Sequence, residues 1–195
     1  MSFVKPAAAA AVLLAAACAS DPFASHPANV EIQHEITTIV QRVRIETGAA
    51  LYDDLKRLVA YDVFAVKQVS ELAEDDNARV RGNALFVLAQ IRDPDHPDVM
   101  KRIEKVLARG LDDSEPAVRL EAASGLALRG KWEVLPVLIG GLESSDSGIR
   151  FRCHEQLLAT TSQDFGFSVD ASAEERKQAV ERWRSFFADW KKSRG

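Results

Sequence analysis

The sequence predicts an all-α protein, built as a short α-solenoid of antiparallel helix pairs with a helical cap at each end. Three observations lead to this prediction. One sequence pattern occurs three times at intervals typical of stacked helical repeats. Alanine and aliphatic residues dominate the 195 residues, and few segments show the alternation expected of strands. The segments that flank the repeats have a helical spacing of apolar residues of their own.

The repeated pattern reads Asp-x4-Val-Arg-x2-Ala-x3-Leu. Its two full copies and a looser third are Asp75, Val80, Arg81, Ala84 and Leu88; Asp113, Val118, Arg119, Ala122 and Leu126; and Ser144, Ile149, Arg150, Cys153 and Leu157. The copies are 38 and then 31 residues apart. Because the Val, Ala and Leu positions fall at i, i+4 and i+8, they form one apolar face of a helix. A single helix pair cannot bury that face, so neighbouring pairs must stack on it.

This pattern resembles that of HEAT repeats over about residues 62–161. In that family the Asp closes the loop between the two helices of a repeat, and the Val-Arg pair opens the second helix. A proline typical of the first helix occurs once, as Pro136, and Lys67 and Lys105 take its place in the other copies. The third copy also has Ser144 instead of an aspartate. The resemblance implies HEAT-like antiparallel helix pairs but no particular activity.

The arginine of each repeat is expected to have a structural role. Its side chain lies one residue off the apolar face, and its fork of donors can reach the Asp-containing loop of its own or an adjacent repeat. The predicted Asp–Arg ladder consists of Asp75, Arg81, Asp113, Arg119 and Arg150. The alternative is that these arginines form an anion-binding row. We expect Arg129, at the end of a helix, to be solvated, so that Arg119→Ala destabilises the fold more than Arg129→Ala.

The N-terminus predicts export. Residues 1–17 contain Lys5 followed by an apolar run that ends in small residues, the layout of a signal peptide. The run is too short to cross a bilayer as a helix of the mature protein. Its last residues and Cys18 resemble the lipobox of bacterial lipoproteins, which implies a lipid on Cys18 and attachment to a membrane. Ala15 departs from the usual leucine, and cleavage by the ordinary signal peptidase to give a secreted or periplasmic soluble protein is the alternative.

The segment after Cys18 is predicted to be a flexible spacer. Residues 18–29 are rich in Ala, Ser and Pro and have no helical period. Ala19 is not the aspartate that resembles a retention signal for the inner membrane. In a cell with two membranes, we therefore expect the periplasmic side of the outer membrane.

Both ends of the solenoid are predicted to be capped. In residues 30–61, apolar residues at helical spacing on either side of Gly48 predict two N-terminal capping helices. Residues 162–195 predict a loop and then an aromatic helix that starts with a capping box of Ser172 and Glu175. This tail resembles that of uncharacterised HEAT-repeat proteins from planctomycetes and related bacteria. Its aromatic stripe, Val180, Trp183, Phe187 and Trp190, is expected to be a lid over the last repeat. An aromatic binding site is the alternative.

No motif in the sequence predicts catalysis, a cofactor or a metal. The four histidines, His26, His34, His96 and His154, lack metal-ligand spacing. No P-loop, Gly-x-Ser-x-Gly or Cys-x-x-Cys is present. With 25 basic and 29 acidic residues, the chain has a net charge of −4, which disfavours binding to a nucleic-acid backbone. Cys153 occupies the small position of the third repeat and is expected to be buried.

The predicted binding face lies on the second helices of the repeats. Positions three, six and ten after the Val point away from the stacked core. They are Asn83, Phe86 and Gln90; Glu121, Ser124 and Leu128; and Arg152, Glu155 and Ala159. This strip is mixed in charge, with exposed apolar groups expected at Phe86 and Leu128. Such a strip suits a protein or peptide partner, although Phe86 could instead pack on the next repeat.

These features together favour a non-catalytic scaffold for protein–protein interaction, attached to a membrane through its lipid. Two alternatives belong to other classes. An accessory factor or enzyme resembling HEAT-like phycobilin lyases would need a chromophore site, and no such residue set is recognisable. A protein resembling HEAT-like DNA glycosylases would need a basic groove, and both the acidity and the export signal count against it.

Overall fold

The computed structural model describes residues 27–194, and their side chains from Asn29 onward. The predicted signal peptide, Cys18 and most of the spacer lie outside the described residues. Within residues 27–194 the protein is all-helical and contains no strand, which confirms the prediction of an all-α protein. The α-helices are α1 (Pro27–Ile45), α2 (Gly48–Ala60), α3 (Val66–Leu72), α4 (Ala78–Gln90), α5 (Pro97–Gly110), α6 (Pro116–Ala127), α7 (Leu135–Gly141), α8 (Ser147–Thr161) and α9 (Ala173–Lys192). Short 3-10 turns at Asp62–Phe64 and Trp132–Val134 precede α3 and α7.

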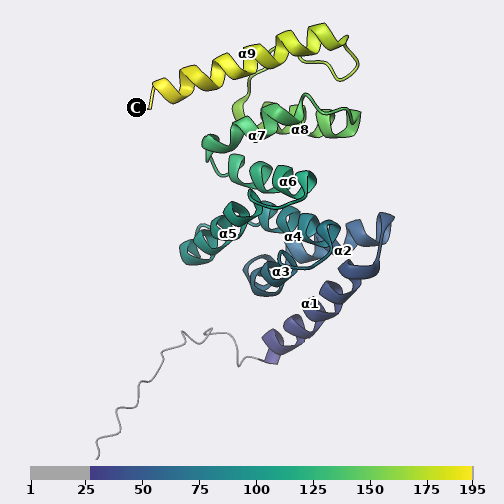
Figure 1. Ribbon diagram of the computed structural model, residues 1–195. Helices are drawn as coiled ribbons and strands as arrows, with labels where there is room; N and C mark the ends of the chain where they lie inside the picture. The colour runs from purple at the N-terminus through teal and green to yellow at the C-terminus, as the bar shows by residue number, and fades with distance from the viewer. Residues whose placement is uncertain (1–26, 195) are drawn as a thin grey trace, which may run out of the picture.

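The helices pack mainly on their neighbours in sequence. α3 packs on α4, α5 on α6 and α7 on α8, and α4 also packs extensively on α6. α2 packs on α1 and on α4, whereas α9 packs on α7. Figure 1 shows the result, in which the helices follow one another in chain order and α1 and α9 lie at opposite ends.

The start of each second helix follows from its sequence. Asn77 caps α4 by accepting from the Arg79 amide at 3.0 Å, and Asp146 caps α8 by accepting from the amides of Gly148 and Ile149. Pro116 lies in the first turn of α6, where a missing N–H costs nothing. These caps fix where each apolar face begins.

The apolar positions of the repeats form the core. The most deeply buried of them are Val80, Ala84, Leu88, Val118, Ala122, Cys153 and Leu157. Two glycines permit the close approach of these helices. A Cβ atom at Gly110 would lie 2.7 Å from Leu85, and one at Gly125 would lie 2.8 Å from Leu107. Both positions therefore exclude any larger residue without movement of a neighbour.

One predicted boundary at the N-terminal end was wrong. α1 begins at Pro27, so the last three residues of the predicted spacer, 27–29, are helical. Proline is tolerated in the first turn of a helix, and its presence therefore did not mark the end of the spacer. The predicted break at Gly48 is present, because Gly48 has φ +66° and separates α1 from α2.

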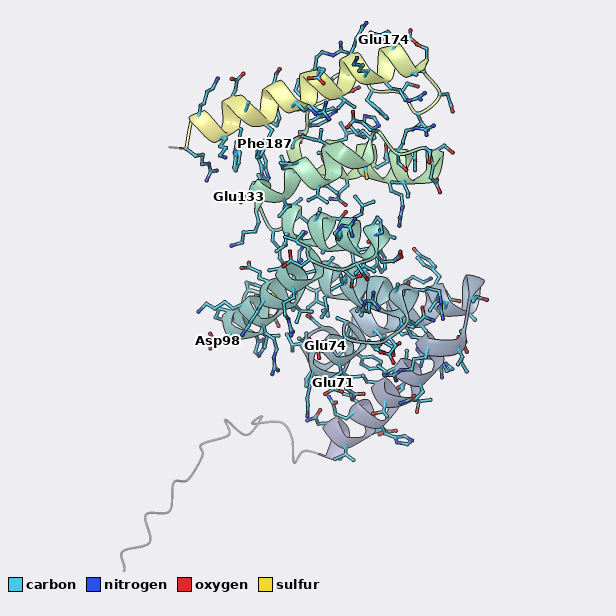
Figure 2. All side chains as sticks on the ribbon, viewed as in Figure 1. Glu71, Glu74, Asp98, Glu133, Glu174 and Phe187 are labelled. Carbon is cyan, nitrogen blue, oxygen red and sulfur yellow. The ribbon has the colours of Figure 1, made fainter. Side chains whose placement is uncertain are left out.

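The C-terminal helix forms an aromatic layer at its end of the molecule. The predicted capping box of Ser172 and Glu175 is confirmed. Trp183 is fully buried, and the Phe165 ring meets it edge to face with centroids 4.7 Å apart. Phe187 packs against the core cluster, and in Figure 2 it lies on the side of α9 that faces the preceding helices.

Candidate binding groove

A groove of about 520 Å³ crosses the second helices of the molecule. Its walls come from α2, from α4 between Ala78 and Phe86, from the start of α6 and from Arg152 of α8. The lining residues are Tyr52, Leu55, Ala78, Arg79, Gly82, Asn83, Phe86, Glu115, Ala117, Val118, Glu121 and Arg152. The groove therefore combines an apolar floor with a few polar groups, which is the usual composition of a binding site.

Arg79 joins the start of α4 to the end of α1. Its guanidinium donates to the carbonyl oxygens of Val43, Arg44 and Glu46, at 3.4, 2.8 and 3.0 Å. These carbonyls are the unsatisfied acceptors at the C-terminal end of α1, where positive charge is also favoured by the helix dipole. Arg79 consequently holds α1 against the start of α4, and the donors that make these bonds are already used.

Gly82 keeps the middle of the groove open. A Cβ atom at this position would meet no atom closer than Val118 Cγ2 and Glu121 Cγ, both at 4.0 Å. Packing therefore does not require glycine here, in contrast to Gly110 and Gly125. Glycine inside a helix costs about 0.5–1 kcal/mol relative to alanine. This loss of stability occurs at a position where any side chain would project into the groove.

Asn83 and Phe86 form the part of the groove that lies along α4. The Asn83 Nδ2 atom is buried and has no hydrogen-bond partner among the described residues. Phe86 is half-buried, packs against the core cluster and lines the groove. The structure combines the two alternatives left open for Phe86, because its side chain packs partly against the core and also lines the groove.

The electrostatics of the groove centre on two carboxylates. Arg152 Nη1 donates to Glu121 Oε1 at 2.7 Å, with the two side chains 54% and 23% exposed. Burial raises the pKa of Glu121, and the nearby Arg152 offsets this only in part. Glu115 is exposed at the N-terminal end of α6, and its carboxylate has no ion-pair partner among residues 27–194.

The predicted binding face is only partly gathered in the groove. Four of its members line it: Asn83, Phe86, Glu121 and Arg152. Gln90, Ser124, Leu128 and Glu155 do not line it, nor does Ala159. Each of them lies closer to the C-terminal end of its helix than Phe86, Glu121 or Arg152, the last groove-lining residues of α4, α6 and α8. Leu128, expected to be exposed, is half-buried, and its carbonyl accepts from Arg92 at 2.9 Å.

Sequence reasoning missed the other half of the site. Tyr52, Arg79, Gly82 and Glu115 were not assigned to a binding face. Tyr52 belongs to a helix outside the repeated pattern, and Arg79 and Glu115 precede the positions that were considered. Gly82 could have been singled out from the sequence, because an isolated glycine within a helical pattern indicates either close packing or a functional role.

Arg81 of the arginine ladder reaches both loops that the sequence left open, that of its own repeat and that of the next one. Arg81 donates to both carboxylate oxygens of Asp113 in the next repeat, at 2.7 and 2.8 Å. Its Nη1 atom donates to the backbone carbonyls of Asp75 and Asp76 in its own repeat. Arg44 of α1 binds the Asp75 carboxylate at 2.9 Å, a contact that the pattern did not reveal. The hydrogen bond from Arg81 lowers the pKa of Asp113. Each of these two carboxylates is therefore bound by an arginine from an earlier helix, α1 for Asp75 and α4 for Asp113.

The later arginines bind carbonyl oxygens. Arg119 Nη1 donates to the backbone of Asp113 and Ser114, at 2.7 and 2.8 Å, and not to the Asp113 carboxylate. Arg150 donates in the same way to the carbonyls of Ser144, Ser145 and Val169. Because Ser144 has no carboxylate, the ladder of ion pairs stops at Asp113.

Arg129 is not solvated, contrary to expectation. Its guanidinium donates to four carbonyls: Leu88, Ala89 and Ile91 at 2.7–2.9 Å, and Gly125 at 3.1 Å. Burial, assisted by the nearby Arg92, lowers its pKa to about 10. Arg129 therefore caps the C-terminal end of α4 from the neighbouring α6, as Arg79 caps α1 from α4.

Comparison with known proteins gives no assignment. No protein-family model matches the chain, and no curated protein matches it. Among residues 27–194, no three His, Cys, Asp or Glu side chains are grouped so that they could hold a metal ion. In the same part of the chain, no helix combines the length and the apolar character needed to span a membrane.

Proposed function

We propose that this protein is a non-catalytic interaction module that binds a segment of a partner protein in the groove across α2, α4, α6 and α8. The observation that carries the proposal is the space left at Gly82, beside the unpaired Asn83 amide and the half-buried Phe86 ring. An aromatic anchor at the centre of a polar rim is the arrangement that contributes most binding energy at protein interfaces.

The proposal includes a HEAT-like solenoid as the scaffold. Three features support it: the successive pairs α3–α4, α5–α6 and α7–α8, the packing of α4 on α6, and the arginine contacts between repeat loops. In such a stack the second helices form a continuous surface, and each repeat adds area to it. A rigid surface of this kind can bind without the cost of ordering a mobile loop.

The proposal also includes a tether to a bacterial membrane. The support is the sequence of residues 1–29, with Cys18 as the acylated residue and the periplasmic side of the outer membrane as the favoured location. Stable anchoring needs more than one acyl chain. Expressed in a bacterium, the wild type should partition into detergent with a mass increased by lipid, and Cys18→Ser should remain aqueous. A wild-type protein without added lipid mass would contradict the proposed tether and would leave the proposed binding in the groove untouched.

The binding role is tested by filling the groove. Gly82→Leu places a side chain in the groove. Gly140→Leu is the matched control, because a Cβ atom at Gly140 meets nothing within 4 Å and Gly140 does not line the groove. The three proteins are used to capture partners from a membrane extract, after their melting temperatures have been compared. We expect a partner that is retained by the wild type and Gly140→Leu and lost by a folded Gly82→Leu. Equal retention by all three would contradict binding in the groove.

A further inference from the structure

We infer that the groove binds an extended basic peptide segment, in which a lysine or arginine stands beside a bulky apolar residue. The inference rests on the proposed function and specifies the chemistry of the partner. It is carried by the charges that remain available in the groove, by one buried donor and by the two aromatic rings that line it.

The available charge of the groove is negative. Four charged side chains line it: Arg79, Glu115, Glu121 and Arg152. Arg79 is directed to the carbonyls at the end of α1, and Arg152 is engaged by Glu121. This leaves the carboxylate of Glu115 free and that of Glu121 paired only with a half-exposed arginine. A cationic side chain from a partner would gain a charge-assisted contact with either carboxylate.

The state of Glu121 supports this reading. Its carboxylate loses solvation at the groove floor, and the resulting rise in its pKa shows that Arg152 does not fully compensate the burial. A second cation beside Glu121 would supply what is missing. An acidic ligand would instead meet two carboxylates and would gain only the contact with Arg152.

The Asn83 amide specifies a second feature of the partner. Its Nδ2 atom is a donor, so it requires an oxygen acceptor, and the described protein provides none within hydrogen-bond distance. A backbone carbonyl of an extended peptide presents such an acceptor. Buried donors that find a partner only in the complex favour ligands able to supply one.

The aromatic rings specify the apolar residue. Phe86 lines the groove from α4, and Tyr52, which is 56% exposed, lines it from α2. The side chain of Leu55 adds an aliphatic contact beneath Tyr52 on the same helix. Lys56 already lies 4.8 Å from the centre of the Tyr52 ring, which shows that this ring accepts a cation on its face.

The experiment is a selection from a phage-displayed library of random heptapeptides. The library is selected on wild-type protein, and clones that also bind Gly82→Leu are discarded. We expect the remaining peptides to be enriched in Lys or Arg next to Leu, Ile, Phe or Trp, and depleted in Asp and Glu. Peptides that depend on the groove but lack basic residues would overturn this inference and leave the proposed function intact.

The selected peptide is then measured by calorimetry against variants of the full chain. We expect the double variant Glu115→Gln with Glu121→Gln, and separately Asn83→Ala, to bind about tenfold more weakly than the wild type. Lys101→Glu, an exposed change on α5, is the control and should bind as the wild type does. Unchanged affinity in the carboxylate variant, or a selection that yields no groove-dependent peptide, overturns the inference. The capture experiment with Gly82→Leu decides the proposed function independently.

Discussion

At the scale of single residues, arginine connects successive elements of this protein in two ways. Arg44 binds a carboxylate in the α3–α4 loop and Arg81 binds one in the α5–α6 loop, whereas Arg79 and Arg129 bind carbonyls at the end of a preceding helix. Both uses exploit the planar fork of donors that lysine lacks. They also place a charge where unsatisfied acceptors would otherwise be exposed to an apolar environment.

The bidentate contact between Arg81 and Asp113 should be a measurable source of stability. Both side chains are largely buried, with 16% and 12% exposed. Removing one partner leaves the other without its hydrogen bonds, so Arg81→Ala should lower the free energy of unfolding by about 2 kcal/mol. Chemical denaturation measures this, with the exposed Lys101→Ala as the control. A loss below about 0.5 kcal/mol would show that the contact is only a surface ion pair.

Arg129→Ala should destabilise the protein more than Arg119→Ala, the reverse of the order that the sequence suggested. The Arg129 variant leaves three carbonyls at the end of α4 without their donor, which should cost about 2–3 kcal/mol. Arg119 serves carbonyls of an exposed loop, where water can replace it at a cost of about 1 kcal/mol. Melting curves of the two variants decide the order. Equal midpoints would mean that the α4 terminus is hydrated.

Glu121→Gln should stabilise the free protein at neutral pH. The pKa of Glu121 is raised in the folded state, so folding of the wild type is penalised once the carboxyl is ionised in the unfolded chain. The penalty is absent below the ordinary glutamate pKa of about 4.3, grows as pH rises, and is complete above the folded-state pKa. We therefore expect a higher melting temperature for the Gln variant at pH 7 and convergence at low pH. A lower melting temperature at pH 7 would mean that the pair with Arg152 outweighs the burial.

At the scale of helices, α4 contains a destabilising glycine, Gly82, at a position that lines the groove. Gly82→Ala should raise the free energy of unfolding by about 0.5–1 kcal/mol, because the added Cβ would lie 4.0 Å from its nearest neighbours and would not clash. Gly125→Ala should lower it, because its Cβ would lie 2.8 Å from Leu107 and 3.0 Å from Ala89. Thermal unfolding of both variants is the measurement. A destabilising Gly82→Ala would show that the glycine is required by the fold and not by the groove.

The sequence was sufficient to predict the helices that carry a regular apolar face. The repeated Val, Ala and Leu positions, the break at Gly48 and the capping box at Ser172 depend on residues close in the chain. The groove depends on how α2, α4, α6 and α8 are placed relative to one another, and a pattern within one helix does not contain that information. Asn83, Phe86, Glu121 and Arg152 of the predicted strip therefore line the groove, and the members nearer the C-terminal ends of the helices do not.

At the scale of the whole molecule, one continuous core links the two ends. The cluster of buried side chains runs from Ile36 in α1 to Trp183 in α9. The aromatic layer of α9 covers the far end, while α1 and α2 cover the other and contribute Tyr52 to the groove. The N-terminal cap is thus part of the proposed binding site as well as a cover for the core (Figure 1).

The central claim is that a partner binds in the groove lined by Asn83, Phe86 and Glu121. Its most direct test is a nuclear magnetic resonance titration of isotope-labelled full-length protein with the captured partner. We predict that the side-chain amide signal of Asn83 moves together with the backbone signals of the groove-lining residues of α4 and α6, because the amide gains an acceptor. Changes confined to α9 and the loop that precedes it, with no shift of the Asn83 amide, would contradict the account.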